Sequence, residues 1–376
     1  MKVVVAMDSF KGSVSSLEAG RAVLLGIRRV LPEAEVIVRP MADGGEGTVE
    51  ALTVGMRGHF EAVEVTGPLG EKVTATYGIL GDRQTAIIEI SAAAGIFLVK
   101  EEERNPMHTT SYGVGELIVH AISKGCRHFI IGLGGSATND GGIGMLQALG
   151  VKFLDAEEKQ VCYGAEGLGQ IVRIDTTNLL PQLSECTFRV ACDVTNPLCG
   201  EQGATAVFSP QKGATQQMVT DMEAAMKRYA EMVLQMRPEA DAAYPGSGAA
   251  GGLGFAFHTF LHGKLESGVQ IVLEETGLES YLKDADLVIT GEGRLDGQTV
   301  MGKAPIGVAR LAKKFQKKVI AFAGCITEEA EACLGEGIDA YFCILPRPVT
   351  LNKAMRPENA KKNLTRTAQQ VMRLLS

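Results

Sequence analysis

Val3-Val-Val-Ala-Met7, an unbroken apolar run near the start of the chain, decides how the protein folds. Such a run followed by turn residues is typical of a strand that is buried on both faces of a parallel sheet. Ser15 and Glu18 have the spacing of a capping box, which predicts a helix from about Ser15 to Leu31. The next apolar run, Val36–Val38, completes a βαβ unit with parallel strands and a right-handed crossover.

The same alternation of strand and helix returns near the other end of the chain. Apolar runs predict strands at Leu287–Thr290, Val319–Phe322 and Ala340–Leu345, with a helix over Gly307–Phe315. Between the two ends, residues 61–90 alternate polar and apolar side chains, which indicates half-exposed antiparallel strands.

The predicted fold class is therefore α/β with two domains. A discontinuous Rossmann-like domain with a parallel sheet is built from both chain ends, residues 1–60 and 284–376, and a mixed α/β domain is inserted over residues 61–283. The length of 376 residues agrees with this division, because one hydrophobic core rarely serves so long a chain.

The composition excludes several classes of partner. A formal net charge of −7 argues against nucleic acid. No stretch approaches the roughly 20 consecutive apolar residues that cross a bilayer, and the apolar run before Asp8 is too short for a signal peptide. We therefore expect a cytoplasmic protein that acts on a small molecule, away from membranes, with a homo-oligomer left open.

Acidic residues between glycines follow three predicted strands of the terminal domain. Asp8 follows the first strand, Asp43 and Glu46 follow the second, and Glu292 and Asp296 follow the strand at 287–290. In an open parallel sheet, ligands bind at the carboxyl ends of the strands, where such loops meet. Capped turns alone would also use Asp and Gly, but three such loops at one edge favour a binding site.

The inserted domain carries a glycine-rich segment, Gly132–Gly142, between a predicted strand at Phe129–Leu133 and a predicted helix at Ile143–Leu149. The backbone N–H groups of such a segment and the N-terminus of the helix are suited to bind an anion, and phosphate is the expected ligand. Asp193 follows another predicted strand of this domain, Phe188–Cys192.

An alternative interpretation uses the same segment. Gly132-Leu-Gly134-Gly-Ser-Ala137 satisfies the dinucleotide-binding pattern, and Asp155 follows about 20 residues later in the position of a ribose ligand. A nicotinamide-dependent oxidoreductase therefore stays open at this point, as does a non-catalytic ligand-binding protein. The acidic Asp140 beside the expected pyrophosphate argues against the oxidoreductase.

Seven motifs, in order along nearly the whole chain, resemble those of the type I glycerate kinases of bacteria. They are Asp8-Ser-Phe-Lys-Gly-Ser13, Ala42-Asp-Gly-Gly-Glu-Gly-Thr48, Gly134-Gly-Ser-Ala-Thr-Asn-Asp-Gly-Gly142, Cys192-Asp-Val-Thr-Asn-Pro197, Ser209-Pro-Gln-Lys-Gly213, Gly248-Ala-Ala-Gly-Gly-Leu-Gly254 and Thr290-Gly-Glu-Gly-Arg-Leu-Asp-Gly-Gln298. The resemblance implies ATP- and Mg²⁺-dependent phosphorylation of D-glycerate, to 2-phosphoglycerate in the most similar bacterial members. Some members carry Glu where this chain has Gly12, so no role of that side chain is transferred.

Phosphoryl transfer needs alignment and charge neutralisation, and the expected site is a cleft between the two domains. The residues assigned to the ATP phosphates are Gly134, Gly135, Ser136, Thr138 and Asn139. The residues assigned to Mg²⁺, directly or through water, are Glu46, Asp140, Glu292 and Asp296.

The substrate needs a cation for its carboxylate and an acceptor for its hydroxyl proton. Lys11 or Arg294 is assigned to the carboxylate, and the loop of Lys11, with Asp8 and Ser9, is assigned to substrate binding. Asp193 or Asp43 is assigned to the proton, and these two acids with Lys11 form the predicted catalytic set.

Overall fold

The structure is a computed structural model that describes residues 1–376. The chain forms two compact units. The terminal unit comprises Met1–Asp43, Glu50–Met56 and Val269–Ser376, and the central unit comprises Gly44–Val49 and Arg57–Gly268. The predicted domain boundaries near 60 and 283 remain a prediction.

The terminal unit is built on a five-stranded sheet in the order β13-β12-β11-β1-β2, and every neighbouring pair is parallel. Its strands are β1 (Lys2–Met7), β2 (Glu35–Val38), β11 (Leu287–Leu295), β12 (Lys318–Ile326) and β13 (Ala340–Cys343). Strands from both ends of the chain pair directly, because Val3 of β1 lies opposite Leu287 of β11. The predicted Rossmann-like sheet built from both chain ends is confirmed.

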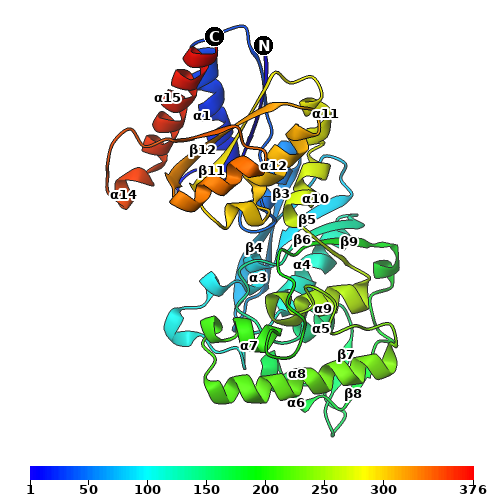
Figure 1. Cartoon of the computed structure of the whole chain (residues 1–376). Coiled ribbons are helices and arrows are strands. Elements are labelled where there is room, and N and C mark those ends of the chain that lie inside the picture. The colour runs from blue at the N-terminus through cyan, green and yellow to red at the C-terminus, as the bar shows by residue number, and fades with distance from the viewer. The chain divides into compact units, whose positions relative to one another are not determined.

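The terminal unit contains eight helices. They are α1 (Ser16–Arg28), α2 (Thr48–Gly55, whose first two residues belong to the central unit), α10 (Gly268–Glu275), α11 (Leu278–Leu282), α12 (Ala304–Lys313), α13 (Ala332–Gly335), α14 (Leu351–Ala354) and α15 (Pro357–Leu375). The predicted capping box is present, since Ser15 and Glu18 each accept the other's backbone N–H. In Figure 1, α1 and α15, the blue and red ends of the chain, lie side by side.

Successive residues of β1 point to opposite faces of the terminal sheet. Val3, Val5 and Met7 share one core with α1 and α15, while α12 packs against β1, β11 and β12 without joining that core. A strand covered on both faces must be apolar throughout, which explains why the opening run of the sequence does not alternate.

The central unit has a six-stranded mixed sheet in the order β10-β9-β6-β5-β4-β3. Its strands are β3 (His59–Thr66), β4 (Lys72–Ile79), β5 (Thr85–Glu89), β6 (His128–Gly132), β9 (Thr187–Ala191) and β10 (Lys264–Glu266), and a separate antiparallel pair is formed by β7 (Lys152–Leu154) and β8 (Arg173–Asp175). The predicted antiparallel pairing within 61–90 is confirmed for β3–β4 and β4–β5, whereas β5, β6, β9 and β10 are mutually parallel.

The helices of the central unit are α3 (Ser91–Ala94), α4 (Tyr112–Ser123), α5 (Ile143–Ala148), α6 (Gly164–Gln170), α7 (Ala204–Phe208), α8 (Gln216–Met236) and α9 (Ala249–Leu261). Helices α4, α5 and α9 contribute to one large apolar core with the sheet. Met226 of α8 lies in that core, so the methionines of α8 that are buried serve packing. None of the helices is both long enough and apolar enough to cross a membrane.

A close contact between α1 and α15 yields the first prediction. A side chain on Gly26 would meet the backbone carbonyl of Thr365 and the Cβ of Ala368. Replacing Gly26 by Val is therefore expected to reduce the free energy of unfolding by about 1–3 kcal/mol through overpacking. Denaturant unfolding measures this, with Leu25→Val on the exposed side of the same helix as the control. Equal losses in both variants would contradict the tight contact.

Candidate functional site

Three carboxylates gather at the carboxyl edge of the terminal sheet. Asp8 directly follows β1 and is only 3% exposed, and Asp43 lies on the segment after β2. Glu292 is 7% exposed and lies within β11, because β11 continues its pairing with β12 as far as Leu295. The sequence prediction that this strand ends at Thr290 is wrong, and Glu292 is held by a strand instead of a loop.

The three carboxylates repel one another. Burial raises the pKa of Asp8 to about 7, and the charges of Asp43 and Glu292 add to this. Burial also raises the pKa of Glu292, with Asp43 again contributing. Buried acids with raised pKa values are typical of sites that bind a cation or transfer protons.

Cations lie beside these acids. The Lys11 Nζ is 3.4 Å from an oxygen of Asp43. Lys303, which the sequence analysis missed, lies with its Nζ 3.8 Å from both Glu292 and Asp296. Arg294 pairs with Asp296 through its Nε at 3.2 Å and keeps an exposed side chain. The predicted residues Asp8, Lys11, Asp43, Glu292, Arg294 and Asp296 thus form one acid–base cluster, which we call the acid cluster.

Ser9 takes part through its backbone, since its N–H donates to the Asp8 Oδ1 at 2.6 Å. Thr299 was also missed, and its hydroxyl donates to Glu292 at 2.9 Å. These donors stabilise the ionised carboxylates only in part, because the pKa values of both acids remain raised.

In the central unit, the carboxyl ends of β5, β6, β9 and β10 share one edge. Gly134 and Gly135 follow β6 and are exposed. The turn 44–49 packs on the same edge, where a side chain on Gly44 would come within 2.6 Å of the Gly268 Cα. Glu89 at the end of β5 accepts the backbone N–H of Val49 at 2.9 Å and holds this turn.

Asp140, which the sequence analysis assigns to Mg²⁺, points into the protein. Its carboxylate is fully buried and accepts the backbone N–H and the hydroxyl of Ser111 and the N–H groups of Gly142 and Gly144. Gly142 and Gly144 lie at the start of α5, so the helix N-terminus is already filled by the protein's own anion. The N–H groups of Gly142 and Gly144 are therefore taken up within the protein, and phosphate binding by residues 134–139 stays a prediction.

The rest of the predicted phosphate segment is also turned inward. Asn139 is fully buried and donates from its side chain to the hydroxyl of Thr205 at 3.0 Å. Thr138 is fully buried, and Ser136 is 8% exposed and accepts a hydrogen bond from Lys212. Of the five residues assigned to ATP, only Gly134 and Gly135 present their backbone to solvent.

Lys212 is the main central-unit residue that the sequence analysis missed. Its Nζ is buried and donates to the Ser136 hydroxyl at 2.8 Å and to the Thr138 carbonyl at 2.6 Å. Burial lowers the pKa of Lys212 to about 7. The available signal was the motif Ser209–Gly213, and the structure shows that this motif supports the loop after β6.

The nicotinamide alternative is not supported. Strand β7, which leads to Asp155, pairs with β8 in a separate sheet and not with β6. Asp155 accepts the N–H groups of Glu157 and Lys159 and closes a turn there. A dinucleotide-binding fold needs the ribose-binding acid on the strand beside the glycine-rich turn, and here the neighbours of β6 are β5 and β9.

The remaining predicted residues are Asp193 and Glu46. Asp193 is exposed after β9, and its Oδ1 accepts the Gly268 N–H at 3.1 Å. Glu46 is exposed on the turn 44–49. The structure contains no group of three or more acidic, His or Cys side chains arranged as a ready metal cage. Of the four acids assigned to Mg²⁺, Glu292 and Asp296 lie in the terminal unit and Glu46 and Asp140 in the central unit.

Comparison with known proteins gives a consistent result. The model of the glycerate kinase family matches residues 3–376. A glycerate kinase of Haemophilus influenzae is 50% identical, with 100% of this chain and 99% of the relative covered. A glycerate 2-kinase of Escherichia coli is 46% identical over 100% and 98% of the two chains. A crystal structure from Salmonella typhimurium LT2, provisionally named as glycerate kinase 2, is 47% identical with a TM-score of 0.92 and covers 100% and 98%.

Asp8→Asn is expected to stabilise the ligand-free protein at about pH 8 by on the order of 2–4 kcal/mol. The pKa of Asp8 is raised from 3.8 to about 7, so burial of the protonated acid stabilises the fold below pH 3.8, and this contribution is lost as the pH rises through 7. The amide carries no charge at any pH. The difference in Tm between variant and wild type should therefore grow from pH 5 to pH 8.

Calorimetric unfolding at several pH values measures this difference. The control is Asp284→Asn, which removes an exposed carboxylate paired with Lys2 and should bring no gain at pH 8. A pH-independent difference for Asp8→Asn would show that Asp8 is not buried as a charge.

Lys212→Met is expected to loosen the loop after β6 while the fold is kept. The thioether fills most of the same space but donates no hydrogen bond to Ser136 or Thr138. Amide hydrogen exchange over residues 134–138 should become faster, by roughly ten-fold if about one net hydrogen bond is lost. Lys227→Met, which removes an exposed pair with Glu223 on α8, is the matched control. Unchanged exchange in both variants would contradict the supporting role.

Proposed function

The chain belongs to the glycerate kinase family and is a kinase, and we propose that it transfers the γ-phosphoryl group of ATP to D-glycerate with the help of Mg²⁺. The proposal takes its substrate from the names of relatives that cover the whole chain. The role proposed for each residue follows from its position at the carboxyl edge of one of the two sheets.

The acid cluster is the observation that carries the proposal. Two of its carboxylates are buried with raised pKa values, and a third lies close enough to raise them further. Buried acids that repel one another are typical of a site where a bound cation offsets the repulsion during function. A small-molecule kinase needs a cation at this place, because the transferred phosphoryl group is highly charged.

Asp8 and Glu292 are the residues best suited to hold Mg²⁺, with Asp43 beside them. Mg²⁺ in kinases is commonly held by one or two carboxylates together with substrate phosphates and water, so the absence of a complete protein cage fits this ion. When bound, Mg²⁺ neutralises charge on the phosphate oxygens. Asp296 contributes indirectly, by positioning Lys303 and Arg294.

Lys11 and Arg294 are proposed to bind the carboxylate of glycerate. Both side chains are more than half exposed, and both already lie next to acids that fix their position, Asp43 and Asp296. An arginine offers a planar pair of donors that matches a carboxylate. A lysine beside Asp43 stays protonated, since Asp43 and Asp8 raise the pKa of Lys11 against the effect of burial.

The backbone amides of Gly134 and Gly135 are proposed to contact the nucleotide phosphates. These glycines are exposed at the end of β6, and the loop that carries them is held from inside by Lys212. Ser136, Thr138 and Asn139 contribute through the shape of this loop instead of direct contact. Fixed amides bind phosphate without a mobile side chain, so little conformational entropy is lost on binding.

In the reaction, the hydroxyl oxygen of glycerate bonds to the γ-phosphorus while the bond to the bridging oxygen of ADP breaks. The hydroxyl proton passes to a carboxylate. Asp43 and Asp193 are the candidates, and Asp43 is favoured because it directly precedes Gly44 in the chain and pairs with Lys11. The glycerate 2-kinase name of one relative supports transfer to the 2-hydroxyl.

The test of the function is release of ADP from Mg-ATP with D-glycerate, with the product identified by phosphorus NMR. A 2-phosphoglycerate signal that depends on both substrates supports the proposal. A 3-phosphoglycerate signal would overturn the position of transfer alone, and ATP left intact would overturn the function.

Lys11→Met is expected to raise KM for D-glycerate at least ten-fold, since one charge-assisted contact of about 1.4 kcal/mol or more is lost. KM for ATP should change less than about two-fold. The control is Lys313→Met, which removes a comparable ion pair with Asp339 near the amino ends of the strands. Steady-state kinetics with each substrate varied gives both constants, and equal changes in both would remove Lys11 from glycerate binding.

A further inference from the structure

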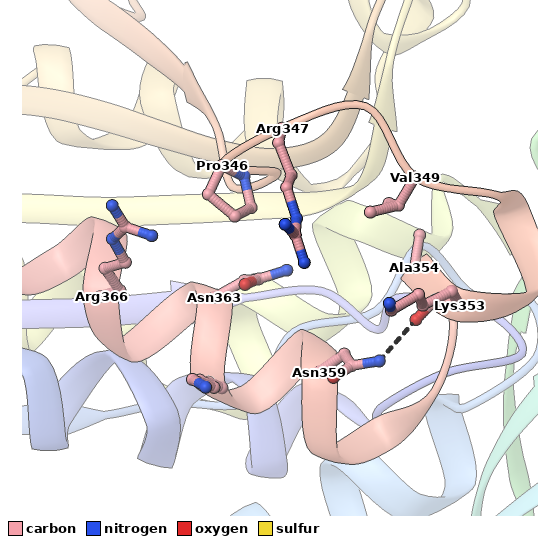
Figure 2. Close-up of a pocket in the computed structure, with 9 residues that line it drawn as sticks. Pro346, Arg347, Val349, Lys353, Ala354, Asn359, Asn363 and Arg366 are labelled. Atoms are coloured by element: carbon pink, nitrogen blue, oxygen red, sulfur yellow. Dashed lines mark hydrogen bonds between the residues drawn. The ribbon is translucent and has the colours of Figure 1, made fainter.

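A basic cavity lies at the C-terminal end of the terminal unit, apart from the residues of the acid cluster. Its volume is about 340 Å³, which is within the range of small-molecule sites. It is lined by the segment after β13, by α14 and by the first half of α15 (Figure 2). The lining residues are Pro346, Arg347, Val349, Lys353, Ala354, Asn359, Lys362, Asn363 and Arg366.

Four of these residues are cations and none is an acid. Arg347, Lys353, Lys362 and Arg366 form no ion pair in the structure, although the chain as a whole carries a net charge of −7. Lys361, the neighbour of Lys362, does pair with an acid, Glu18. A cation of α15 therefore forms an ion pair where an acid lies within reach, and no acid lines the cavity.

One face of α15 packs in the core, and its polar face therefore lines the cavity. Ala360, Leu364 and Ala368 are buried in the core shared with α1, which leaves the positions at helical spacing, Asn359, Asn363 and Arg366, on the cavity side. Figure 2 shows the Arg347 side chain reaching from the loop toward Asn363.

The opposite wall of the cavity is fixed to the helix. Asn359 donates from its side chain to the Lys353 carbonyl at 2.8 Å and ties α14 to α15. All four cations are exposed, so water and salt screen their mutual repulsion. An anion that enters the cavity nevertheless meets four positive charges and no acid.

We propose that this cavity binds a small phosphorylated anion at a site separate from the catalytic residues. Arginine and lysine side chains with carboxamide donors suit the many acceptor oxygens of phosphate. Asn359, in the first turn of the 19-residue helix α15, also lines the cavity. The volume fits a compact compound with two or more negative charges, such as a phosphorylated hydroxy acid or the diphosphate part of a nucleotide.

Anion binding in the cavity could affect the acid cluster of the same unit through a contact between Met355 and Gly12. Met355 follows α14 directly, and its Cε lies within 2.8 Å of where a side chain on Gly12 would stand. Gly12 is the neighbour of Lys11. A shift of α14 on anion binding would therefore reach the loop that holds Lys11.

The test is calorimetric titration with inorganic pyrophosphate in the absence of Mg²⁺, so that the acid cluster repels the probe. Wild type should bind one equivalent, and Arg347→Gln/Arg366→Gln should weaken binding about 100-fold, at about ten-fold for each lost contact. Arg373→Gln, an exposed arginine on the same helix outside the cavity, should bind as wild type does. Asn363→Asp, which adds an acid without removing a cation, should also weaken binding.

Parallel titrations with 2-phosphoglycerate and with ADP identify the source of the phosphate, since the tighter of the two is the natural class. Equal affinities of wild type and the double variant for pyrophosphate, or no binding of any of the three probes, would overturn the proposal. Glycerate-dependent ADP release by the double variant should stay within about three-fold of wild type. Loss of that activity with unchanged Tm would place the cavity in the catalytic site and overturn its separateness. The titration does not require catalysis, so a failed kinase assay leaves this test intact.

Discussion

The carboxylate of Asp140 fixes the loop geometry on which the central unit depends. It is fully buried and is held by N–H donors from the start of α5 and by both donors of Ser111, and the buried Lys212 lies near enough to interact with its charge. A buried charge of this kind is tolerable only if its hydrogen bonds are nearly complete. The need for these donors dictates the path of residues 136–144, turns their side chains inward, and leaves Gly134 and Gly135 as the exposed part of the segment.

The acid cluster of the terminal unit follows the opposite rule. Burial raises the pKa of Asp140 as it does that of Asp8 and Glu292. Asp8 and Glu292 differ from Asp140 in that they accept fewer hydrogen bonds and that neighbouring carboxylates raise their pKa values further. Lys11 and Lys303 reduce the repulsion without removing it, because their nearest distances to the acids are 3.4 and 3.8 Å. The central unit thus completes the hydrogen bonds of its buried acid to build a rigid loop, whereas the terminal unit leaves its acids short of partners, as expected of a site that is completed by ligands.

The sequence predicted the sheets well because their signals are local. The continuous apolar run of β1 and the capping box at Ser15 and Glu18 depend on near neighbours alone. The residues of the acid cluster were also predictable, since the carboxyl ends of parallel strands must share an edge. Which side of a loop faces the ligand was not predictable. Asp140 looks like a metal ligand in a glycine-rich motif, and only the position of Ser111, 29 residues earlier, shows that its oxygens are occupied.

Lys212 was missed for the same reason. Its partners Ser136 and Thr138 lie more than 70 residues away in the chain, and a buried lysine has no sequence pattern of its own. The β6 loop also suggested a dinucleotide site because the local pattern is right, and the pairing of β7 with β8 is a property of the whole fold. Local motifs therefore identified the positions that matter, while long-range packing decided what each one does.

The distribution of charge separates two kinds of phosphate recognition within the terminal unit. At the acid cluster, every cation named lies beside a carboxylate, so a phosphate that comes without a metal ion meets net repulsion there. In the basic cavity the cations have no acidic partner, so a metal-bound phosphate, whose charge is largely neutralised, has little to gain. Under the two proposals, these places select different states of the same chemical group, one with its metal ion and one without. A phosphorylated compound could then act on the protein without competing for the proposed site of Mg-ATP.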